Sequence, residues 1–179
     1  MQTRLFLALE LPDDLRDALS SLSTGVPGAY PEDEDTLHLT VRYLGSPEGG
    51  KVRDLCERLR RLELARFPLV LNGFGFFPPR GEPESLWVGV ERSEALDSLR
   101  AKVDGLATRT GMEADRRRYT PHVTVARLSD APESRLMSFI AGQALWKSRP
   151  FEVERLTLFS SHGRDWGREY QREEVFLIR

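Results

Sequence analysis

Two segments of the chain place a histidine and a threonine two residues apart: His38 precedes Thr40, and His122 precedes Thr124. Side chains alternate between the two faces of an extended strand, so each histidine shares a face with its threonine. The neighbours that project from the opposite face are Leu and Val. Each segment is therefore expected to be a strand with one apolar face for packing and one polar face open for chemistry.

Two imidazoles and two hydroxyls that converge on one point suit an in-line displacement at phosphorus. A neutral imidazole can take a proton from attacking water, and a protonated one can give a proton to the departing oxygen, because the pKa of histidine allows both states near neutrality. Threonine hydroxyls can donate to phosphate oxygens as negative charge grows on them. This chemistry needs no metal when the leaving group is modest.

Other interpretations of the histidines are weaker. A lone histidine on a strand is more often a packing residue, but two histidines with the same neighbour argue against that interpretation. A two-histidine metal site would need further ligands, and no carboxylate or third histidine repeats beside both segments. The remaining histidine, His162, has no motif around it and is expected in a surface loop near the mouth of the site.

The two segments also form an internal repeat. Residues 36–44 align with residues 120–128 without gaps, and Thr, His, Thr, Val and Leu fall at matching places. Chance similarity between two strands is the alternative, but the chain has only three histidines and two of them fall in this repeat. The repeat predicts duplication of a lobe. If a pseudo-twofold axis relates the lobes, the two polar faces confront each other across a cleft.

The elements that position these residues are predicted from apolar periodicity and turn signals. Strands are expected over residues 4–11, 37–44, 67–77, 85–91, 122–128, 151–161 and 168–178. Helices are expected over residues 12–23, 51–62, 93–111 and 133–141. No linker-like composition divides the chain, so residues 1–179 are predicted to form one domain of two duplicated lobes.

Length and composition set limits on the class of protein. The 179 residues, 40% hydrophobic and 30% charged, are typical of a soluble globular protein. No apolar run approaches the ~18 residues of a membrane span. A single cysteine, Cys56, excludes an internal disulfide and a cysteine-based zinc site, so a cytoplasmic location is expected. A monomer without cofactor or membrane partner is predicted.

Charge alone does not indicate nucleic-acid binding, because the net charge is −2. The distribution is more informative, since Arg116, Arg117 and Arg118 form a basic run just before His122. The favoured interpretation is a solvated charged face. The alternative is a rim that attracts phosphate.

At its histidine motifs the chain resembles the two-histidine (2H) phosphoesterase superfamily. More narrowly, it is similar to the bacterial and archaeal RNA 2′,3′-cyclic phosphodiesterases, historically called 2′-5′ RNA ligases. Residues 37–45 resemble the first catalytic motif of that family, and residues 119–127 resemble the second. The opening strand at residues 4–12 and the closing segment at 156–161, with Gly167 and Tyr170, extend the resemblance over nearly the whole chain.

The resemblance implies a fold and an activity. The expected fold is bilobal and α+β, with two antiparallel sheets flanking a central groove and helices outside. The implied reaction is hydrolysis of an RNA or nucleotide 2′,3′-cyclic phosphate to a 2′-phosphomonoester. By resemblance His38 is the proton donor to the departing 3′-oxygen, His122 is the proton acceptor, and Thr40 and Thr124 hold the phosphate. The residues by themselves do not favour this order of roles over its reverse.

Four flanking residues are candidates for substrate binding. Arg127 matches an arginine of the family, but strict alternation places it on the face opposite His122, so phosphate contact requires a bulge or strand end. Arg42 shares the face of the first pair and is expected at the groove rim. Phe6 and Tyr119 can stack a base, although packing is the favoured role for both.

Two alternative functions stay open at this point. The first is RNA joining, the reverse reaction, in which a 5′-hydroxyl replaces water. The second is a non-catalytic module that binds RNA ends, for which an intact pair of histidine motifs has no use. The predicted substrate is an RNA with a 2′,3′-cyclic phosphate end or a cyclic nucleotide.

Overall fold

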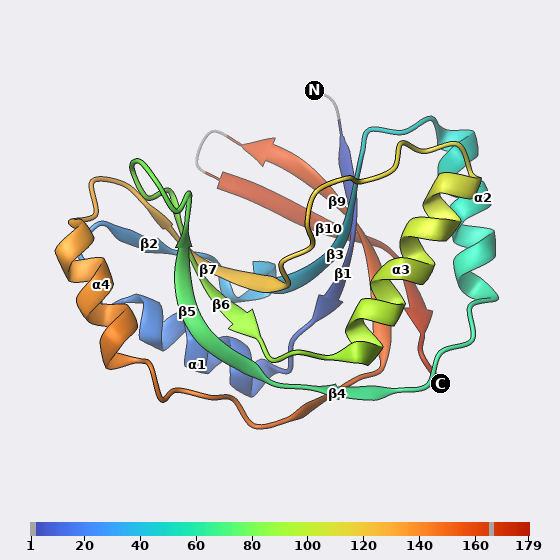
Figure 1. The fold of residues 1–179 in the computed structure, drawn as a ribbon. Coiled ribbons are helices and arrows are strands. Elements are labelled where there is room, and N and C mark those ends of the chain that lie inside the picture. The colour runs from blue at the N-terminus through green and yellow to red at the C-terminus, as the bar shows by residue number, and fades with distance from the viewer. Residues whose placement is uncertain (1–2, 165–166) are drawn as a thin grey trace.

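The computed structural model describes residues 3–164 and 167–179 and shows an α+β fold (Figure 1). Two four-stranded antiparallel sheets stand beside each other, and a two-stranded ribbon joins them at one end. The predicted fold class, α+β with antiparallel sheets, is confirmed. The strands that carry the histidine motifs, β3 (His38–Gly45) and β7 (His122–Leu128), are in tertiary contact, which brings the two sheets together.

The first sheet contains, in spatial order, β10 (Gly167–Leu177), β9 (Arg155–Arg164), β1 (Arg4–Glu10) and β3 (His38–Gly45). The second contains β2 (Ala29–Pro31), β7 (His122–Leu128), β6 (Ser85–Val90) and β5 (Leu71–Phe77). The ribbon pairs β4 (Phe67–Leu69) with β8 (Phe151–Val153). The first sheet therefore combines strands from the two ends of the sequence, whereas all strands of the second lie within residues 29–128.

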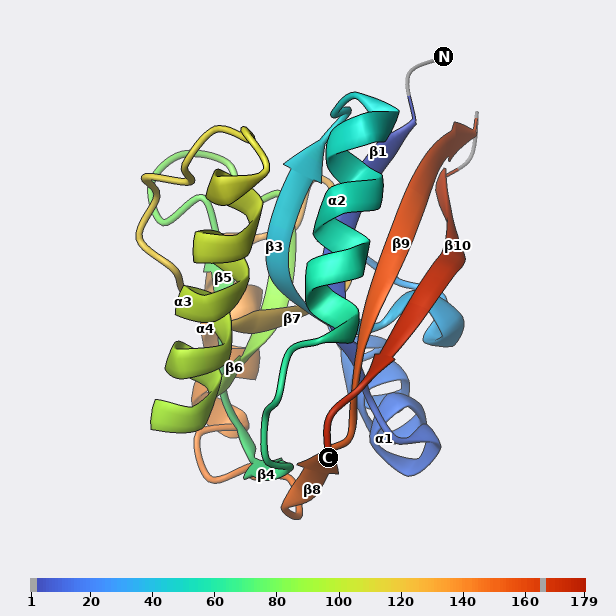
Figure 2. The ribbon, with the colours of Figure 1, turned by 90° about the vertical axis from the view of Figure 1, so that its right-hand side faces the viewer.

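The helices cover the outer faces of the sheets, as Figures 1 and 2 show. They are α1 (Asp13–Ser23), α2 (Gly49–Arg60), α3 (Glu94–Arg109) and α4 (Glu133–Gly142). Helix α1 follows β1 yet packs against β7 of the second sheet, and α3 follows β6 yet packs against β3 of the first. This exchange interlocks the two halves of the chain.

Local sequence signals account for most element boundaries. Asp13 and Asp14 occupy the first turn of α1, where the positive end of the helix dipole favours acids. The Ser93 side chain accepts a hydrogen bond from the Leu96 amide and caps α3. Strand β2 and a short 3-10 turn at Glu34–Thr36 were not predicted, because this acidic stretch lacks an apolar pattern. The tip of the predicted loop at 161–167, residues 165–166, lies outside the described residues.

The core fills the space between the outer sheet faces and the helices. Leu39 and Val41 of β3, and Val123 and Val125 of β7, are almost fully buried. They belong to one apolar cluster that runs through both sheets and all four helices. The alternation predicted from the sequence is confirmed there. No helix in the described part of the chain is long and apolar enough to cross a membrane.

Candidate active site

Both motif strands carry a β-bulge at the same place in the repeat. In the β1–β3 ladder, Thr40 and Arg42 face consecutive residues of β1, so Val41 is the extra residue. In the β6–β7 ladder, Thr124 and Ala126 face consecutive residues of β6, so Val125 is extra. A bulge places two successive side chains on one side and reverses the alternation beyond it. The residues after each bulge therefore lie on faces that strict alternation does not predict.

The imidazole of His38 is held by the backbone two residues earlier in the chain. Its Nδ1 lies 2.6 Å from the carbonyl oxygen of Thr36. A carbonyl can only accept, so Nδ1 carries the hydrogen and Nε2 is the nitrogen that gains and loses a proton. Nε2 lies 3.1 Å from the hydroxyl of Thr40, which confirms that the pair shares one face of the strand.

His122 repeats this arrangement. Its Nδ1 lies 2.7 Å from the carbonyl oxygen of Thr120, again two residues earlier, which leaves Nε2 for proton transfer. His122 and Thr124 are both half-buried, whereas Val123 between them is fully buried. We call the face of each sheet that carries a His–Thr pair its histidine face. Two imidazoles oriented alike are the arrangement that a paired acid and base require.

The protonation of His38 depends on its surroundings. Burial lowers the pKa of His38 because it penalises the charged imidazolium. The hydrogen bond to Thr36 opposes this effect, and the positive charge of His122 lowers the pKa of His38 further. The two histidines are thus close enough to influence each other electrostatically. In the free protein, His38 favours its neutral form more than an exposed histidine does.

Aromatic side chains form a wall behind His38. The Phe6 ring centroid lies 4.8 Å from that of His38, and Tyr170 meets the imidazole edge-on at 5.2 Å. Phe159 stacks on Phe6 at 5.4 Å. Phe6 is only 3% exposed, so the prediction that it stacks a substrate base is wrong. Its ring instead supports the imidazole, which agrees with the packing role that the sequence favoured.

A second aromatic wall stands beside His122. Phe77 meets this imidazole edge-on at 5.1 Å, and Trp87 lies 6.0 Å from it. A Cβ on Gly75 would lie 2.3 Å from the Trp87 ring, so glycine is needed there for the indole to lie flat on β5. Sequence reasoning missed these aromatic residues. Trp87 comes to the site because it pairs with Thr124 across the β6–β7 ladder, and that register is not visible in the sequence.

Arg127 lies on the exposed side of β7, because the strand contains the β-bulge that the sequence analysis named as the condition for this position. Val125 and Ala126 both point into the core, at 1% and 0% exposure, and Arg127 follows on the exposed side. The bulge thus turns the arginine toward the histidine face of β7. Its guanidinium Nε lies 3.9 Å from a carboxylate oxygen of Glu32, and its side chain is 62% exposed. The guanidinium of Arg127 is therefore accessible to a ligand.

Arg42 does not lie at the rim, so that prediction is wrong. The bulge at Val41 turns Arg42 away from the His38 face and into the protein, where it is 3% exposed. Its Nη1 donates to Asp104 Oδ1 at 2.6 Å, and Nη2 donates to the carbonyl oxygen of Glu113 at 2.5 Å. Arg42 is therefore a structural residue that joins β3 to α3 and to the chain after α3.

A neighbouring arginine extends this buried network. Arg100 of α3 donates to the carbonyl oxygen of Val41, the extra residue of the β3 bulge. It also contacts Asp104 and Asp115 at 3.1 Å each, and its guanidinium lies 4.9 Å from the Tyr119 ring centroid. Because buried charges need partners, this network fixes the bulge against α3 and the segment that leads to β7.

Tyr119 connects the two motif strands. Its hydroxyl donates to the carbonyl oxygen of Thr40 at 2.9 Å, although Tyr119 itself lies just before His122. Burial raises the pKa of Tyr119, so the phenol stays protonated and remains a donor. Tyr119 is therefore a positioning residue, which agrees with the packing role that the sequence favoured, and base stacking by Tyr119 stays a prediction.

The change Tyr119→Phe is expected to lower kcat about threefold to tenfold with little change in KM. Loss of one hydrogen bond of ~1 kcal/mol loosens the connection between the motif strands without removing any group that touches substrate. Steady-state kinetics beside Tyr30→Phe, which removes a hydroxyl from an exposed tyrosine, measures the effect. A lower melting temperature with unchanged kcat would show that Tyr119 has only a structural role.

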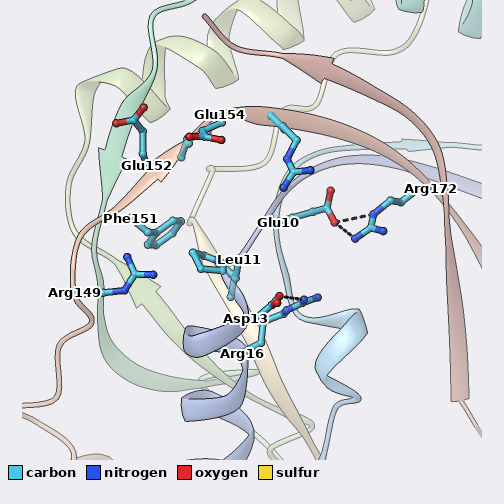
Figure 3. A pocket seen from close by; sticks show the side chains of 12 residues that line it. Glu10, Leu11, Asp13, Arg16, Arg149, Phe151, Glu152, Glu154 and Arg172 are labelled. Atoms are coloured by element: carbon cyan, nitrogen blue, oxygen red, sulfur yellow. Dashed lines mark hydrogen bonds and ion pairs between the residues drawn. The ribbon is translucent and has the colours of Figure 1, made fainter.

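Two other features lie near the site without completing it. A cavity of about 470 Å³ borders Glu10, the residue opposite His38 in the β1–β3 ladder (Figure 3). Four arginines and four carboxylates line the cavity, and Figure 3 shows Arg172 bound to Glu10. These charges balance in number, so the cavity has no net positive charge that would favour a phosphate. His162 lies in strand β9, not in a loop as predicted, and its Nε2 is 3.0 Å from the Ser160 hydroxyl.

No group of three His, Cys, Asp or Glu side chains within residues 3–164 and 167–179 is placed to hold a metal ion. The site itself presents five side chains that can take part in chemistry. These are two anchored imidazoles with Nε2 available, two hydroxyls beside them and one exposed guanidinium. Together they can transfer protons and bind an oxyanion.

Several known proteins are similar to this chain in sequence and in fold. The model of the 2′-5′ RNA ligase superfamily matches residues 8–165. The RNA 2′,3′-cyclic phosphodiesterase of Thermus thermophilus is 34% identical over 98% of this chain and 90% of its own length. The proteins of the same name from Geobacillus stearothermophilus and Aeropyrum pernix are 33% and 35% identical, and this chain spans 42% and 65% of their lengths.

Solved structures agree with these sequence relatives. The protein TT0787 of Thermus thermophilus superposes with a TM-score of 0.79 at 26% identity, covering 98% of each chain. The LigT protein of E. coli, in a complex with 3′-AMP, superposes with a TM-score of 0.78 at 23% identity, covering 99% of each chain. At that identity, LigT shows that the fold is shared.

Proposed function

The chain belongs to the 2′-5′ RNA ligase superfamily, and we propose that it is a metal-independent phosphodiesterase that opens RNA or nucleotide 2′,3′-cyclic phosphates to 2′-phosphomonoesters. The observation that carries this proposal is the repeated anchoring of His38 and His122. Each Nδ1 is held by a carbonyl two residues earlier, which leaves each Nε2 available as acid or base. The name shared by the curated relatives supports the same reaction.

The proposed reaction moves two protons. His122 Nε2 takes a proton from water, whose oxygen attacks phosphorus. The bond from phosphorus to the ribose 3′-oxygen breaks, and His38 Nε2 gives that oxygen its proton. The product keeps the phosphate on the 2′-oxygen, and the two histidines regain their starting states through solvent. Thr40 and Thr124 donate to the non-bridging oxygens as charge develops there.

The lowered pKa of His38 bears on its proposed role as donor. A donor must be protonated before transfer, and the free protein favours neutral His38. A bound phosphate carries negative charge, which favours the imidazolium and opposes the effect of burial. The donor role therefore predicts that substrate raises the pKa of His38. Arg127 would then hold the phosphate from the second sheet.

The position of the phosphate in the product tests this function. Each of the four 2′,3′-cyclic mononucleotides is incubated with the protein in excess chelator, and the product is identified by phosphorus NMR. We expect a 2′-phosphate at the same rate with and without chelator. A 3′-phosphate would reverse the assignment of the leaving oxygen, and inhibition by chelator would contradict a metal-independent mechanism. Absence of turnover for all four, and for a short RNA that ends in a 2′,3′-cyclic phosphate, would overturn the function.

A further inference from the structure

A second cavity, of about 550 Å³, opens at the far end of strand β3 from His38. It lies between the connection from β3 to α2 and the connection from α3 to β7. Figure 2 shows these connections beside the N-terminal end of α2 and the C-terminal end of α3. Its lining includes Tyr43, Lys51 and Arg117. The proton-transfer chemistry described above uses none of these residues.

Positive charge gathers at this cavity. Arg117 belongs to the run Arg116–Arg118, and all three arginines of the run are exposed. Asp115 also lines the cavity, but Arg100 and Arg117 already bind its carboxylate. Within the described part of the chain, Arg116, Arg118 and Lys51 form no ion pair. Of the two carboxylates that line the cavity, those of Glu113 and Asp115, only that of Glu113 has no arginine partner in the described structure. The lining and the adjoining Arg116 and Arg118 therefore carry a net positive charge that favours phosphates.

Tyr43 joins this surface to the catalytic residues. The bulge at Val41 turns it onto the histidine face of β3, where it is 54% exposed. Its ring centroid lies 5.9 Å from that of Phe6, which in turn lies 4.8 Å from His38. Because both rings contact Phe6, the Tyr43 and His38 ring centroids lie within about 11 Å of each other, the sum of these two distances. An exposed aromatic ring beside free cations is the pattern that binds single-stranded nucleic acid.

We propose that this surface binds the RNA chain on the 5′ side of the terminal cyclic phosphate. Tyr43 stacks a base, and Lys51, Arg116 and Arg118 pair with backbone phosphates. The direction follows from chemistry, because a cyclic phosphate occupies the 2′- and 3′-oxygens of the last ribose and the chain continues only through the 5′-oxygen. This inference rests on the proposed function and makes oligonucleotides better substrates than mononucleotides.

The test compares kcat/KM for a short RNA ending in a 2′,3′-cyclic phosphate with kcat/KM for the cyclic mononucleotide. In the triple variant Lys51→Gln, Arg116→Gln, Arg118→Gln, we expect the preference for the oligomer to fall about tenfold or more at low salt and to depend less on salt. Mononucleotide turnover stays at the wild-type value. Arg135→Gln, in an exposed position on α4, is the matched control and leaves both rates unchanged.

A separate variant tests the aromatic part. Tyr43→Ala is expected to weaken binding of an oligomer with an uncleavable 3′-phosphate about fivefold to a hundredfold, measured by fluorescence anisotropy. Equal affinities of wild type, Tyr43→Ala and the triple variant would overturn the inference, as would an unchanged oligomer preference. These binding measurements need no turnover, so the RNA surface and the proposed activity can fail independently.

Discussion

Replacing either His38 or His122 by alanine is expected to lower turnover of a 2′,3′-cyclic nucleotide by about 10²–10⁴-fold. Each change removes one of the two proton-transfer groups, and neither imidazole has a described neighbour that could replace it. KM is expected to change much less than kcat, because the Thr40 and Thr124 hydroxyls and the Arg127 guanidinium still bind the phosphate. Initial rates in chelator, with circular dichroism to verify folding, measure the effect.

His162→Ala is the matched control for these variants. This third histidine bonds to Ser160 on β9 and takes no part in the proposed reaction, so its loss is expected to leave kcat within about twofold. Wild-type turnover in His38→Ala or in His122→Ala would contradict the two-histidine mechanism. A loss in His162→Ala as large as in the other two would contradict the assignment of the site.

A substrate with a sulfur atom in place of the departing 3′-oxygen is expected to restore most of the activity that His38→Ala loses. A thiolate departs without protonation, so the donor becomes unnecessary. His122→Ala is expected to stay impaired by about 10²-fold or more with the same substrate, because water still needs a base. Comparing oxygen and sulfur substrates in each variant measures the effect.

The two variants control each other in this experiment. Both remove an imidazole with the same anchoring to a carbonyl two residues earlier, so a general defect in folding or binding affects both in the same way. Recovery of His122→Ala in place of His38→Ala would exchange the proposed roles. Recovery of neither would show that His38 acts on something other than the leaving group.

The alternating strands were predictable because their signal is local. Leu39 and Val123 sit between a histidine and a threonine, and a strand has one way to bury them while leaving the polar pair on the other face. The family resemblance is confirmed, and so is the antiparallel α+β fold that it implied. The resemblance rests mainly on the two short histidine motifs, whose residue types can be recognised in the sequence.

The positions of the arginines were not predictable from alternation. One extra residue, Val41 or Val125, reverses the faces that follow, and bulges of this kind leave no clear mark in a single sequence. Arg42 therefore became a buried partner of Asp104, and Arg127 became an exposed residue on the histidine face. The condition set for Arg127, a bulge, is the one that the structure contains.

Residues that act through contacts with parts of the chain far away in the sequence could not be predicted either. Tyr119 bonds to the backbone of Thr40 across the two motif strands, and Trp87 reaches His122 through the register of β6. Such contacts depend on how strands pair, which one sequence does not fix. The lobe duplication, the cytoplasmic location and the monomeric state stay predictions.

The double variant His38→Ala, His122→Ala, assayed in chelator beside both single variants, tests most directly whether the two strands form one site. Groups that act as a unit in one transition state are not additive. The account predicts that the double variant is within a few-fold of the more damaged single variant. Losses that multiply to the product of the two single effects would contradict a single site, because they would show two histidines acting independently.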